Sequence, residues 1–234
     1  MKTIVLPDLH HKVGWVSTFL KKCEPYDEVV FVGDYFDDFN DNEYIAKGTA
    51  HWLKESLSCP NRKHCIGNHD LPYMLPYINP VYACPGYTDE KNQVINQVLT
   101  KNHWAKLVPA VYTQGWLISH AGFDFRLYRE DVYPAIDEMI EEANKGLYRA
   151  MNGEWDKHFV AGARMGQPFV AGITWADWRE LVPIVGVKQI VGHTPDRYVR
   201  ERRVTKTQTD YCIDTNRRSA IIIKNGKVDV VSTT

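Results

Sequence analysis

Short apolar runs that end abruptly in polar residues recur along the chain. They cover residues 3–6, 28–32, 63–66, 115–118 and 188–191. Each run is too short for a helix, and β-branched residues, which favour buried strands, are common in them. We therefore predict a strand at each of these positions.

Helical spacing of apolar residues marks the stretches between these runs. Residues 13–23, 41–57 and 131–151 each place apolar side chains on one face of a helix. Strands that alternate with helices predict an α/β sandwich. Near the C-terminus, residues 219–231 form two β runs around an Asn-Gly pair, which predicts a hairpin.

Two other stretches have no clear period. Residues 71–113 are rich in Tyr and Pro, and residues 152–178 carry Gly, Trp and Phe. Both contain too many large apolar groups to be flexible linkers. We interpret them as insertions, at about 71–113 and 123–180, that form loops or a cap over the strand ends of a single domain of residues 1–234.

Composition narrows the class of protein. The 234 residues are 44% hydrophobic and 24% charged, which is typical of a globular domain and not of a disordered chain. The 28 basic and 29 acidic residues almost balance, which argues against a nucleic-acid binder that works by bulk charge. No apolar run approaches the ~20 residues of a membrane helix. The first residues do not resemble a signal peptide.

The cysteines point to a reducing compartment. There are five, an odd number, and no two form a Cys-x-x-Cys pair. A disulfide framework is therefore not expected in a chain of this length, and we predict free, mostly buried thiols in a cytoplasmic protein.

The residues that follow the predicted strands carry metal-binding and proton-transfer chemistry. The set is Asp8, His10, Asp34, Asp37, Asn68, His69, His120 and His193. In open α/β sheets the carboxyl ends of the strands meet at one crevice, where ligands bind. We expect these side chains to gather there.

Six of these residues form a ligand set for two metal ions. Carboxylate, imidazole and amide groups together suit Mn²⁺, Fe or Zn²⁺ better than Ca²⁺, which prefers oxygen alone. If Asp34 bridges the ions, the set divides into Asp8, His10 and Asp34 for one ion and Asp34, Asn68, His120 and His193 for the other. Two ions about 3.5–4 Å apart clamp a phosphoryl group and hold a bridging hydroxide near neutral pH.

The remaining two residues suit proton transfer. His69 is next to a predicted ligand but is not needed as one, so it could protonate the leaving oxygen of a phosphate ester. Asp37 could hold the His69 ring and keep it protonated.

Each fragment taken alone also has a structural interpretation. A lone Asp-x-His is weak evidence, Gly-Asp-x-x-Asp is usually a turn, and a single histidine is more often part of a core. All of the fragments in order, each after a strand, are unexpected by chance. The other histidines have no such context, so we assign structural roles to His11, His51, His64, His103 and His158.

At these motifs the chain resembles the calcineurin-like binuclear metallophosphoesterases. The motifs are Asp8-Leu9-His10, Gly33-Asp34-Tyr35-Phe36-Asp37, Gly67-Asn68-His69-Asp70, Ser119-His120-Ala121-Gly122 and Gly192-His193-Thr194-Pro195. The resemblance covers residues 3 to about 223. It implies a four-layer α/β/β/α sandwich with cap-like insertions, two divalent ions on the six ligands, and a His69–Asp37 general-acid pair.

Within that superfamily, the chain is similar to the branch of bacteriophage-lambda-type protein phosphatases and symmetrical diadenosine-tetraphosphate hydrolases. Cys212-Ile-Asp-Thr215 resembles the Ile-Asp-Thr-Gly of that branch, with Asn216 in place of glycine. Residues 174–179 resemble its Trp-x-x-Arg region. This implies that Arg179, together with Asn68, contacts the substrate.

The chain departs from the branch where an arginine normally grips phosphate. Asp38 stands at that position, and an anion there weakens phosphate binding. We expect Asp38 to turn outward, or Arg164 or Arg179 to take over. Pro195 stands where nuclease-type members carry a second histidine, which argues against a nuclease.

These observations predict a phosphoprotein-phosphatase-like enzyme that cleaves phosphate monoesters and acts on a phosphorylated substrate, either a phosphoprotein or a nucleotide. The hydroxide between the ions would attack directly, and Mn²⁺ is the favoured metal, with Fe, Zn, Ni and Mg as alternatives. A nucleotide hydrolase that acts on dinucleoside polyphosphates, cyclic nucleotides or nucleic-acid phosphate ends is the alternative activity, and a scaffold that has lost catalysis is a third interpretation.

Two further features bear on the substrate. A nucleotide base could stack on aromatic residues of the insertions, although packing within a cap is the favoured interpretation. These are Tyr73, Tyr77, Tyr82, Trp155 and Phe159. The basic residues 197–206 could guide an anion to the site, or form a solvated loop or edge strand.

Overall fold

The strands of the protein form two sheets. The computed structural model describes residues 1–75, 82–128 and 135–233. The first sheet has the order β11-β10-β1-β2-β3-β4. Its strands are β1 (Lys2–Leu6), β2 (Glu28–Phe31), β3 (Arg62–Cys65), β4 (Leu107–Val108), β10 (Ser219–Lys224) and β11 (Lys227–Ser232). Strands β1 to β4 are parallel, and β10 pairs antiparallel with both β1 and β11.

The second sheet has the order β5-β6-β7-β9-β8. Its strands are β5 (Ala110–Thr113), β6 (Trp116–Ser119), β7 (Gln189–Val191), β8 (Arg200–Arg203) and β9 (Thr209–Cys212). Strands β6, β7 and β9 are parallel, and the edge strands β5 and β8 are antiparallel to their neighbours. The basic stretch at 197–206 thus contains an edge strand, one of the two structural alternatives for it.

The two sheets pack against each other through alternate residues of their strands. Ile4 and Leu6 of β1 belong to a hydrophobic cluster that includes helix residues. Val5, between them, belongs to a second cluster with Ile118 of β6 and Ile190 of β7. Because successive side chains of a strand point to opposite faces, β1 is buried on both sides. This explains why the strands appear in the sequence as continuous apolar runs.

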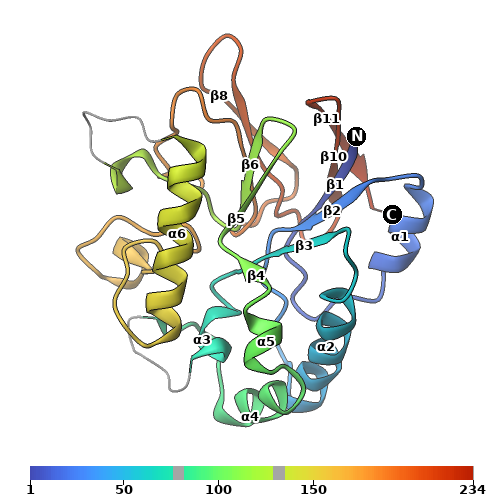
Figure 1. Ribbon diagram of the computed structural model, residues 1–234, viewed down its shortest axis with the longest axis vertical. Coiled ribbons are helices and arrows are strands. Elements are labelled where there is room, and N and C mark those ends of the chain that lie inside the picture. Colours follow the sequence, from blue (N-terminus) through green and yellow to red (C-terminus); the bar gives the residue numbers. More distant parts are fainter. Residues whose placement is uncertain (76–81, 129–134, 234) are drawn as a thin grey trace.

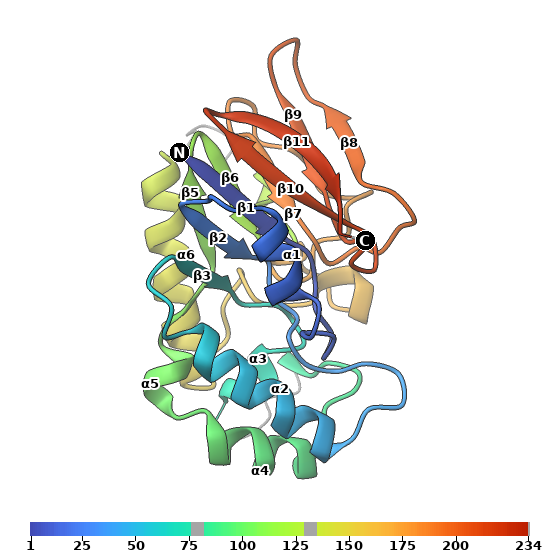
Figure 2. The same cartoon turned by 90° about the vertical axis from the view of Figure 1, so that its right-hand side faces the viewer.

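Helices cover the outer sides of the sheets (Figures 1 and 2). The longer ones are α1 (Val16–Lys22), α2 (Glu43–Ser56), α4 (Asp89–Val98) and α6 (Ile136–Met151). Phe19 of α1 and Leu53 of α2 join the cluster on the outer face of the first sheet, and α6 packs beside β5. The result is a mixed α/β fold with two sheets flanked by helices, which confirms the predicted fold class.

Short helices complete the chain. They are α3 (Leu71–Met74) and α5 (Lys101–Trp104), with the 3₁₀ turns η2 (Phe125–Leu127) and η3 (Gly162–Met165). Helices α3, α4 and α5 lie together below the sheets, and α4 packs against α2 (Figure 1). Residues 71–113, interpreted above as an insertion of loops or a cap, thus contain three helices within the described part. Their many Tyr and Pro residues mask the helical spacing in the sequence. Strands β4 and β5, at the end of this stretch, belong to the two sheets.

The other predicted elements agree with the structure to within a few residues. All five predicted strands and the C-terminal hairpin are present. The helix predicted at 13–23 begins only at Val16, because residues 9–13 form a turn in which Lys12 N–H donates to the Leu9 carbonyl. Residues 131–134 of the third predicted helix lie outside the described part. Within the described residues, no helix has the length and apolarity needed to cross a bilayer.

Candidate metal centre

The predicted ligands converge where five strands end. Asp8 follows β1, Asp34 follows β2, Asn68 follows β3, His120 follows β6 and His193 follows β7. The first three strands are parallel neighbours in one sheet, and the last two are parallel neighbours in the other. The two packed sheets therefore deliver their side chains to one place.

The first group of possible metal ligands lies on the loops that follow β1 and β2. Asp8, His10 and Asp34 each offer one ligand atom, and these atoms lie within 4.8 Å of one another. Nε2 of His10 is 3.7 Å from Oδ2 of Asp34. Both aspartates are almost fully buried. This is the donor set predicted for the first ion.

A second group shares Asp34 with the first. The ligand atoms of Asp34, His120 and His193 also lie within 4.8 Å of one another. Oδ1 of Asn68 is 2.9 Å from Nε2 of His120, and that nitrogen is 3.3 Å from Oδ2 of Asp34. All of the residues predicted for the second ion are thus brought together, with Asp34 between the two groups.

Hydrogen bonds to the backbone fix the direction of two imidazole rings. Nδ1 of His10 is 2.6 Å from the Asp37 carbonyl oxygen, and Nδ1 of His120 is 3.0 Å from the Val32 carbonyl oxygen. A carbonyl only accepts, so each Nδ1 carries the proton and donates. Nε2 of each ring then keeps its lone pair for a ligand, as in metal-binding histidines.

The loop after β2 is shaped by a buried carboxylate that the sequence analysis left without a role. Asp70 accepts hydrogen bonds from the backbone N–H groups of Asp34, Tyr35 and Gly67, each at 2.8 Å. A Cβ at Gly67 would overlap with Oδ1 of Asp34, so only glycine allows this approach. The Gly-Asn-His-Asp motif therefore positions Asp34 as well as supplying Asn68.

Strained backbone is concentrated at the centre. His10, Asp34, Asp37 and His193 all have positive φ angles, between 42° and 65°. Such angles are uncommon for residues with a side chain and persist only where the surroundings hold them. At the Gly-His motif, His193 N–H donates to Oδ2 of Asp8 at 3.0 Å, which links the loops after β7 and β1.

The buried carboxylates and imidazoles of the centre shift one another's pKa values. Burial raises the pKa of Asp8 to about 8, and the nearby Asp214 carboxylate contributes to that rise. Burial alone would lower the pKa of His120, but the carboxylates of Asp34 and Asp8 outweigh it and raise that pKa to about 9. Burial also opposes the charged form of Asp34, but His120 and His69 hold its pKa well below the usual range.

This donor set fits divalent metal ions. Buried carboxylates crowded together need a counter-charge, and a cation bound by them displaces the competing protons. Oxygen and nitrogen donors occur together in both groups, as Mn²⁺, Fe and Zn²⁺ sites require. The number and kind of ions stay a prediction.

The predicted acid pair lies beside the ligands. Nδ1 of His69 is 3.1 Å from Oδ2 of Asp37, and the His69 backbone N–H donates to Oδ1 of Asp34. Cys84 also belongs to this site, because its Sγ lies 3.3 Å from Nδ1 of His69 and 3.1 Å from the Asn68 amide nitrogen. Burial raises the pKa of Cys84, and so its thiol stays protonated.

Behind Asp37 lies a network that the sequence did not reveal. Lys91 of α4 places its Nζ 2.7 Å from Oδ1 of Asp37 and 2.9 Å from Oδ2 of Asp41. Tyr73 of α3 donates to the same Asp37 oxygen at 2.6 Å. His11, predicted to be structural, pairs with Asp41 at 2.9 Å. His11, Asp37 and Asp41 would form a third cation site, but the Lys91 ammonium group already supplies the charge there.

Asp38 and Arg179 are both paired with side chains outside the two donor groups. Asp38 turns to Lys12 and pairs with it. Arg179 pairs with Asp177 at 2.9 Å and its side chain is 78% exposed, so its contacts do not join it to the ligand groups. The side chain of Arg164 is outside the described part. The role of Arg179 therefore stays a prediction that these contacts do not support.

The aromatic residues proposed for base stacking are mostly packed inside. Tyr73, Tyr82 and Phe159 are fully buried, which agrees with the packing interpretation. Trp155 is half exposed and packs edge-on against Phe169. Tyr77 lies outside the described residues.

One further carboxylate was overlooked. Asp214 follows β9, is buried, and lies close enough to Asp8 to raise the pKa of that group. The resemblance of Cys212-Ile-Asp-Thr215 to a family segment could have indicated it. Asp70 could have been found in the same way, as the last residue of Gly-Asn-His-Asp.

Comparison with known proteins agrees with this geometry. A family model described as calcineurin-like phosphoesterase matches residues 1–231. No curated protein matches the chain significantly.

Solved structures share the fold at low sequence identity. A cold-active protein tyrosine phosphatase is 17% identical with a TM-score of 0.58, and the match covers 98% of this chain and 78% of that one. The cold-active protein-tyrosine phosphatase of a psychrophilic Shewanella species is 15% identical with a TM-score of 0.56, covering 99% and 80%. A putative diadenosine tetraphosphatase is 14% identical with a TM-score of 0.55, covering 99% and 93%.

Proposed function

The chain belongs to the calcineurin-like phosphoesterase family, and we propose that within it the protein hydrolyses phosphate monoesters by direct attack of solvent on phosphorus. The observation that carries the proposal is the pair of donor groups that share Asp34, with the His69–Asp37 pair at their edge. A metallophosphoesterase needs both parts in one place: a cage for two cations and a proton donor.

The cage would be formed by the six predicted ligands. Asp8, His10 and Asp34 would hold one ion, and Asp34, Asn68, His120 and His193 the other. Divalent ions bound there, with Mn²⁺ favoured, would supply a solvent nucleophile at neutral pH and offset the charge of the phosphate. The nearby Cys84 thiol does not compete for the nucleophile's role, since it is held in its protonated form.

The protein's own groups would then control the leaving group. His69 is partly exposed, so a substrate can reach its Nε2 while Nδ1 faces Asp37. The Asp37 carboxylate orients the ring, and Lys91 and Tyr73 hold that carboxylate in turn. His69 would donate its proton to the oxygen that departs with the alcohol.

The substrate is assigned by class only. Phosphoproteins are the proposed substrates, and nucleotides are the alternative substrates. Burial of Tyr73, Tyr82 and Phe159 removes three of the aromatic residues that supported the alternative, whereas Trp155 stays half exposed. A phosphopeptide and a dinucleoside tetraphosphate, compared by turnover number on one enzyme preparation, separate the two.

The activity is tested with an aryl phosphate. Protein stripped of metal with a chelator is assayed alone and after addition of Mn²⁺, Fe²⁺, Zn²⁺, Ni²⁺ or Mg²⁺. We expect no turnover in the stripped protein and recovery with Mn²⁺. Absence of turnover with every metal, in protein shown to be folded, would contradict the proposed activity and favour a scaffold.

A cytoplasmic location is proposed on the state of the thiols. All five cysteines are free, and four are buried. Free thiols persist in reducing compartments, where they behave as small apolar residues.

A further inference from the structure

Cys84 lies between the proposed metal ligand Asn68 and the proposed acid His69. The Asn68 amide nitrogen donates to Sγ of Cys84 at 3.1 Å, and Nδ1 of His69 is 3.3 Å from the same sulfur. Among the described residues, this sulfur is the only hydrogen-bond acceptor of that amide nitrogen. The thiol is neither a ligand nor a nucleophile in the proposed reaction, so its contacts with two site residues need another explanation.

The two ends of the Asn68 amide face different groups. Oδ1 is 2.9 Å from Nε2 of His120, on the side of the second donor group, whereas Nδ2 faces Cys84. Nε2 of His120 keeps its lone pair for an ion, because Nδ1 of that ring donates to the Val32 carbonyl. Oδ1 of Asn68 is therefore directed at the same ion. If the amide turned over, its N–H groups would point at the cation, and Asn68 could not be a ligand.

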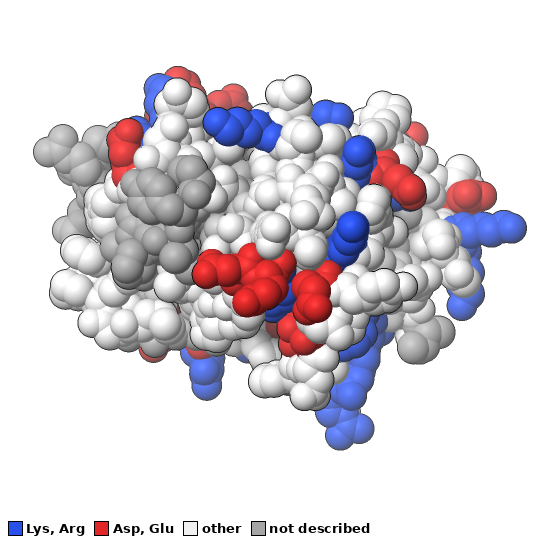
Figure 3. Space-filling model, turned by 90° about the horizontal axis from the view of Figure 1, so that it is seen from below, with Lys and Arg blue, Asp and Glu red and all other residues white. Residues whose placement is uncertain are grey.

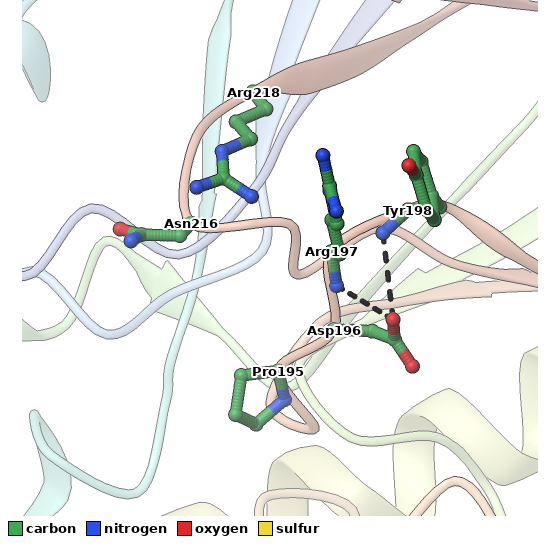
Figure 4. A pocket seen from close by; sticks show the side chains of 6 residues that line it. All are labelled: Pro195, Asp196, Arg197, Tyr198, Asn216 and Arg218. Atoms are coloured by element: carbon green, nitrogen blue, oxygen red, sulfur yellow. Dashed lines mark hydrogen bonds between the residues drawn. The ribbon is translucent and has the colours of Figure 1, made fainter.

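The nitrogen end of the amide is shielded from bulk water. Asn68 is only 2% exposed. The wide surface cavity of about 740 Å³ that is lined by residues 195–198, 216 and 218 does not include it (Figure 4). A buried N–H group that loses its acceptor is destabilised. The contact with Cys84 therefore favours the orientation of the amide in which Oδ1 faces the ion.

The loop that carries Cys84 is held against the centre at two points. Gly86 has a φ of 99°, and a Cβ there would lie 3.0 Å from side-chain atoms of Asp37, so the loop passes directly over the acid pair. Cys84 itself belongs to a small apolar cluster with Trp175. The Trp175 ring packs edge-on against His193, with 5.8 Å between the ring centroids. The sulfur is thus fixed in place beside the second donor group.

A thiol suits this position because it accepts a hydrogen bond and is easily buried among apolar groups. The centre already holds several buried carboxylates, and further acidic side chains gather near the middle of the face seen from below (Figure 3). A carboxylate in place of Cys84 would add another negative charge beside Asp37. A hydroxyl could accept the same hydrogen bond without that charge, so serine should be able to replace Cys84.

We propose that Cys84 is a positioning residue of the metal centre, which holds the Asn68 amide with Oδ1 toward the second ion. The proposal rests on the proposed function, which assigns Asn68 to that ion. The sulfur lies at the nitrogen end of the amide, so it is not itself a ligand. Among the described residues, Cys84 forms no hydrogen bond with the first donor group. Binding of the first ion should therefore not depend on Cys84. The first donor group is Asp8, His10 and Asp34.

The test measures Mn²⁺ binding to protein stripped of metal with a chelator. The variants C84A and C84V remove the acceptor and leave a smaller or a larger apolar side chain, whereas C84S keeps an acceptor. C23V is the matched control, because Cys23 is also a buried thiol but lies at the end of α1. The electron paramagnetic resonance signal of free Mn²⁺ gives the number of bound ions and the dissociation constant of each. Urea unfolding of each stripped variant shows whether it is folded.

We expect two Mn²⁺ sites in the wild type. C84A and C84V should weaken one site at least about 10-fold and leave the other within about 2-fold, because the hydrogen-bonding partner of one ligand is lost. C84S should keep both dissociation constants within about 3-fold, and C23V should leave both within about 2-fold. Rescue by serine distinguishes the hydrogen bond from packing, because valine fills the space without an acceptor.

Several outcomes would overturn the inference while leaving the proposed function intact. These are wild-type affinity at both sites in folded C84A and C84V, and equal weakening of both sites. Failure of C84S together with C84A, or failure of both apolar variants to fold, would also overturn it, since the thiol would then act through packing. If stripped wild-type protein binds fewer than two Mn²⁺ ions, the proposed metal centre itself is contradicted.

Discussion

The buried ammonium group of Lys91 lies 2.7 Å from the carboxylate of Asp37, and both side chains are only 3% exposed. Lys91 belongs to α4, far along the chain from the Gly-Asp-x-x-Asp motif that supplies Asp37. Lys91 N–H is also bound by Thr88, the residue that caps α4, so the helix holds the lysine in place. A helix within residues 71–113, a stretch whose sequence shows no clear period, thus supports the proposed acid pair.

Replacing Lys91 by methionine is expected to destabilise the protein. K91M keeps the apolar stem but leaves Asp37 and Asp41 buried together without their cation. Breaking a buried ion pair by removing one partner costs about 3 kcal/mol or more. Urea unfolding at pH 7 measures the loss. K47M, at an exposed lysine of α2, is the control and should change the free energy of unfolding by less than about 0.5 kcal/mol. Equal stability of the two variants would show that Lys91 is dispensable.

Removing His69 should affect poor leaving groups far more than good ones. H69N is expected to lower kcat for an alkyl phosphate at least about 100-fold, because the departing alkoxide needs a proton. The effect on 4-nitrophenyl phosphate should be much smaller, since nitrophenolate leaves without protonation. The exposed His51 on α2 provides the control H51N. An equal loss on both substrates would assign His69 a role other than proton donation.

Asp34 is the residue on which both donor groups depend. D34N keeps the side-chain size and removes the shared charge, so we expect fewer than about one tightly bound ion per chain and a loss of turnover of about 100-fold or more. Metal analysis after dialysis measures the first effect, and aryl phosphate hydrolysis the second. D229N, on the exposed side of β11, should retain the metal content of the wild type. Full metal retention by D34N would rule out the shared ligand.

The buried His64 makes stability depend on pH. Burial lowers the pKa of His64 from 6.5 to about 3, with a smaller effect of Arg62, and the ring stacks on Phe31 at 4.5 Å. The unfolded chain takes up a proton near pH 6.5, but the folded protein does so only near pH 3. The contribution of His64 is therefore complete above pH 6.5 and is lost as the pH falls toward 3.

The size of this effect follows from the shift. Between pH 8 and pH 5 the wild type should lose about 2 kcal/mol through His64, at about 1.4 kcal/mol per pH unit below 6.5. H64Q cannot titrate, so it should lack this part of the pH dependence whatever its stability at pH 8. Urea unfolding of both proteins at the two pH values gives the difference. Parallel pH curves would contradict the assignment.

Much of the candidate metal centre could be predicted because each of its residues lies next to a recognisable strand in the sequence. Each predicted ligand comes shortly after an apolar run, so the strand and the residue that follows it are recognised together. Asp8 after β1 and Asp34 after β2 are examples. The same reasoning placed the C-terminal hairpin, because its Asn-Gly turn is set by neighbouring residues.

The residues that contact the predicted site from other segments could not be predicted, because their partners lie far away in the sequence. Lys91 has the spacing of an ordinary helix residue, and only the packing of α4 against α2 brings it to Asp37. Cys84 was interpreted as a small apolar residue, yet its thiol contacts His69. No local pattern marks such residues.

The position of β1 in the first sheet has a consequence for synthesis of the protein. β1 pairs with β10 on one side, and Asp8 at its end is hydrogen-bonded to His193, 185 residues away. A polypeptide still emerging from the ribosome can pair β1 with β2, but it lacks the other partners of this region until His193 and β10 have been made. Of the two proposed donor groups, the one formed by Asp8, His10 and Asp34 is therefore synthesised early, whereas the one that includes His193 is complete only after that residue has been made.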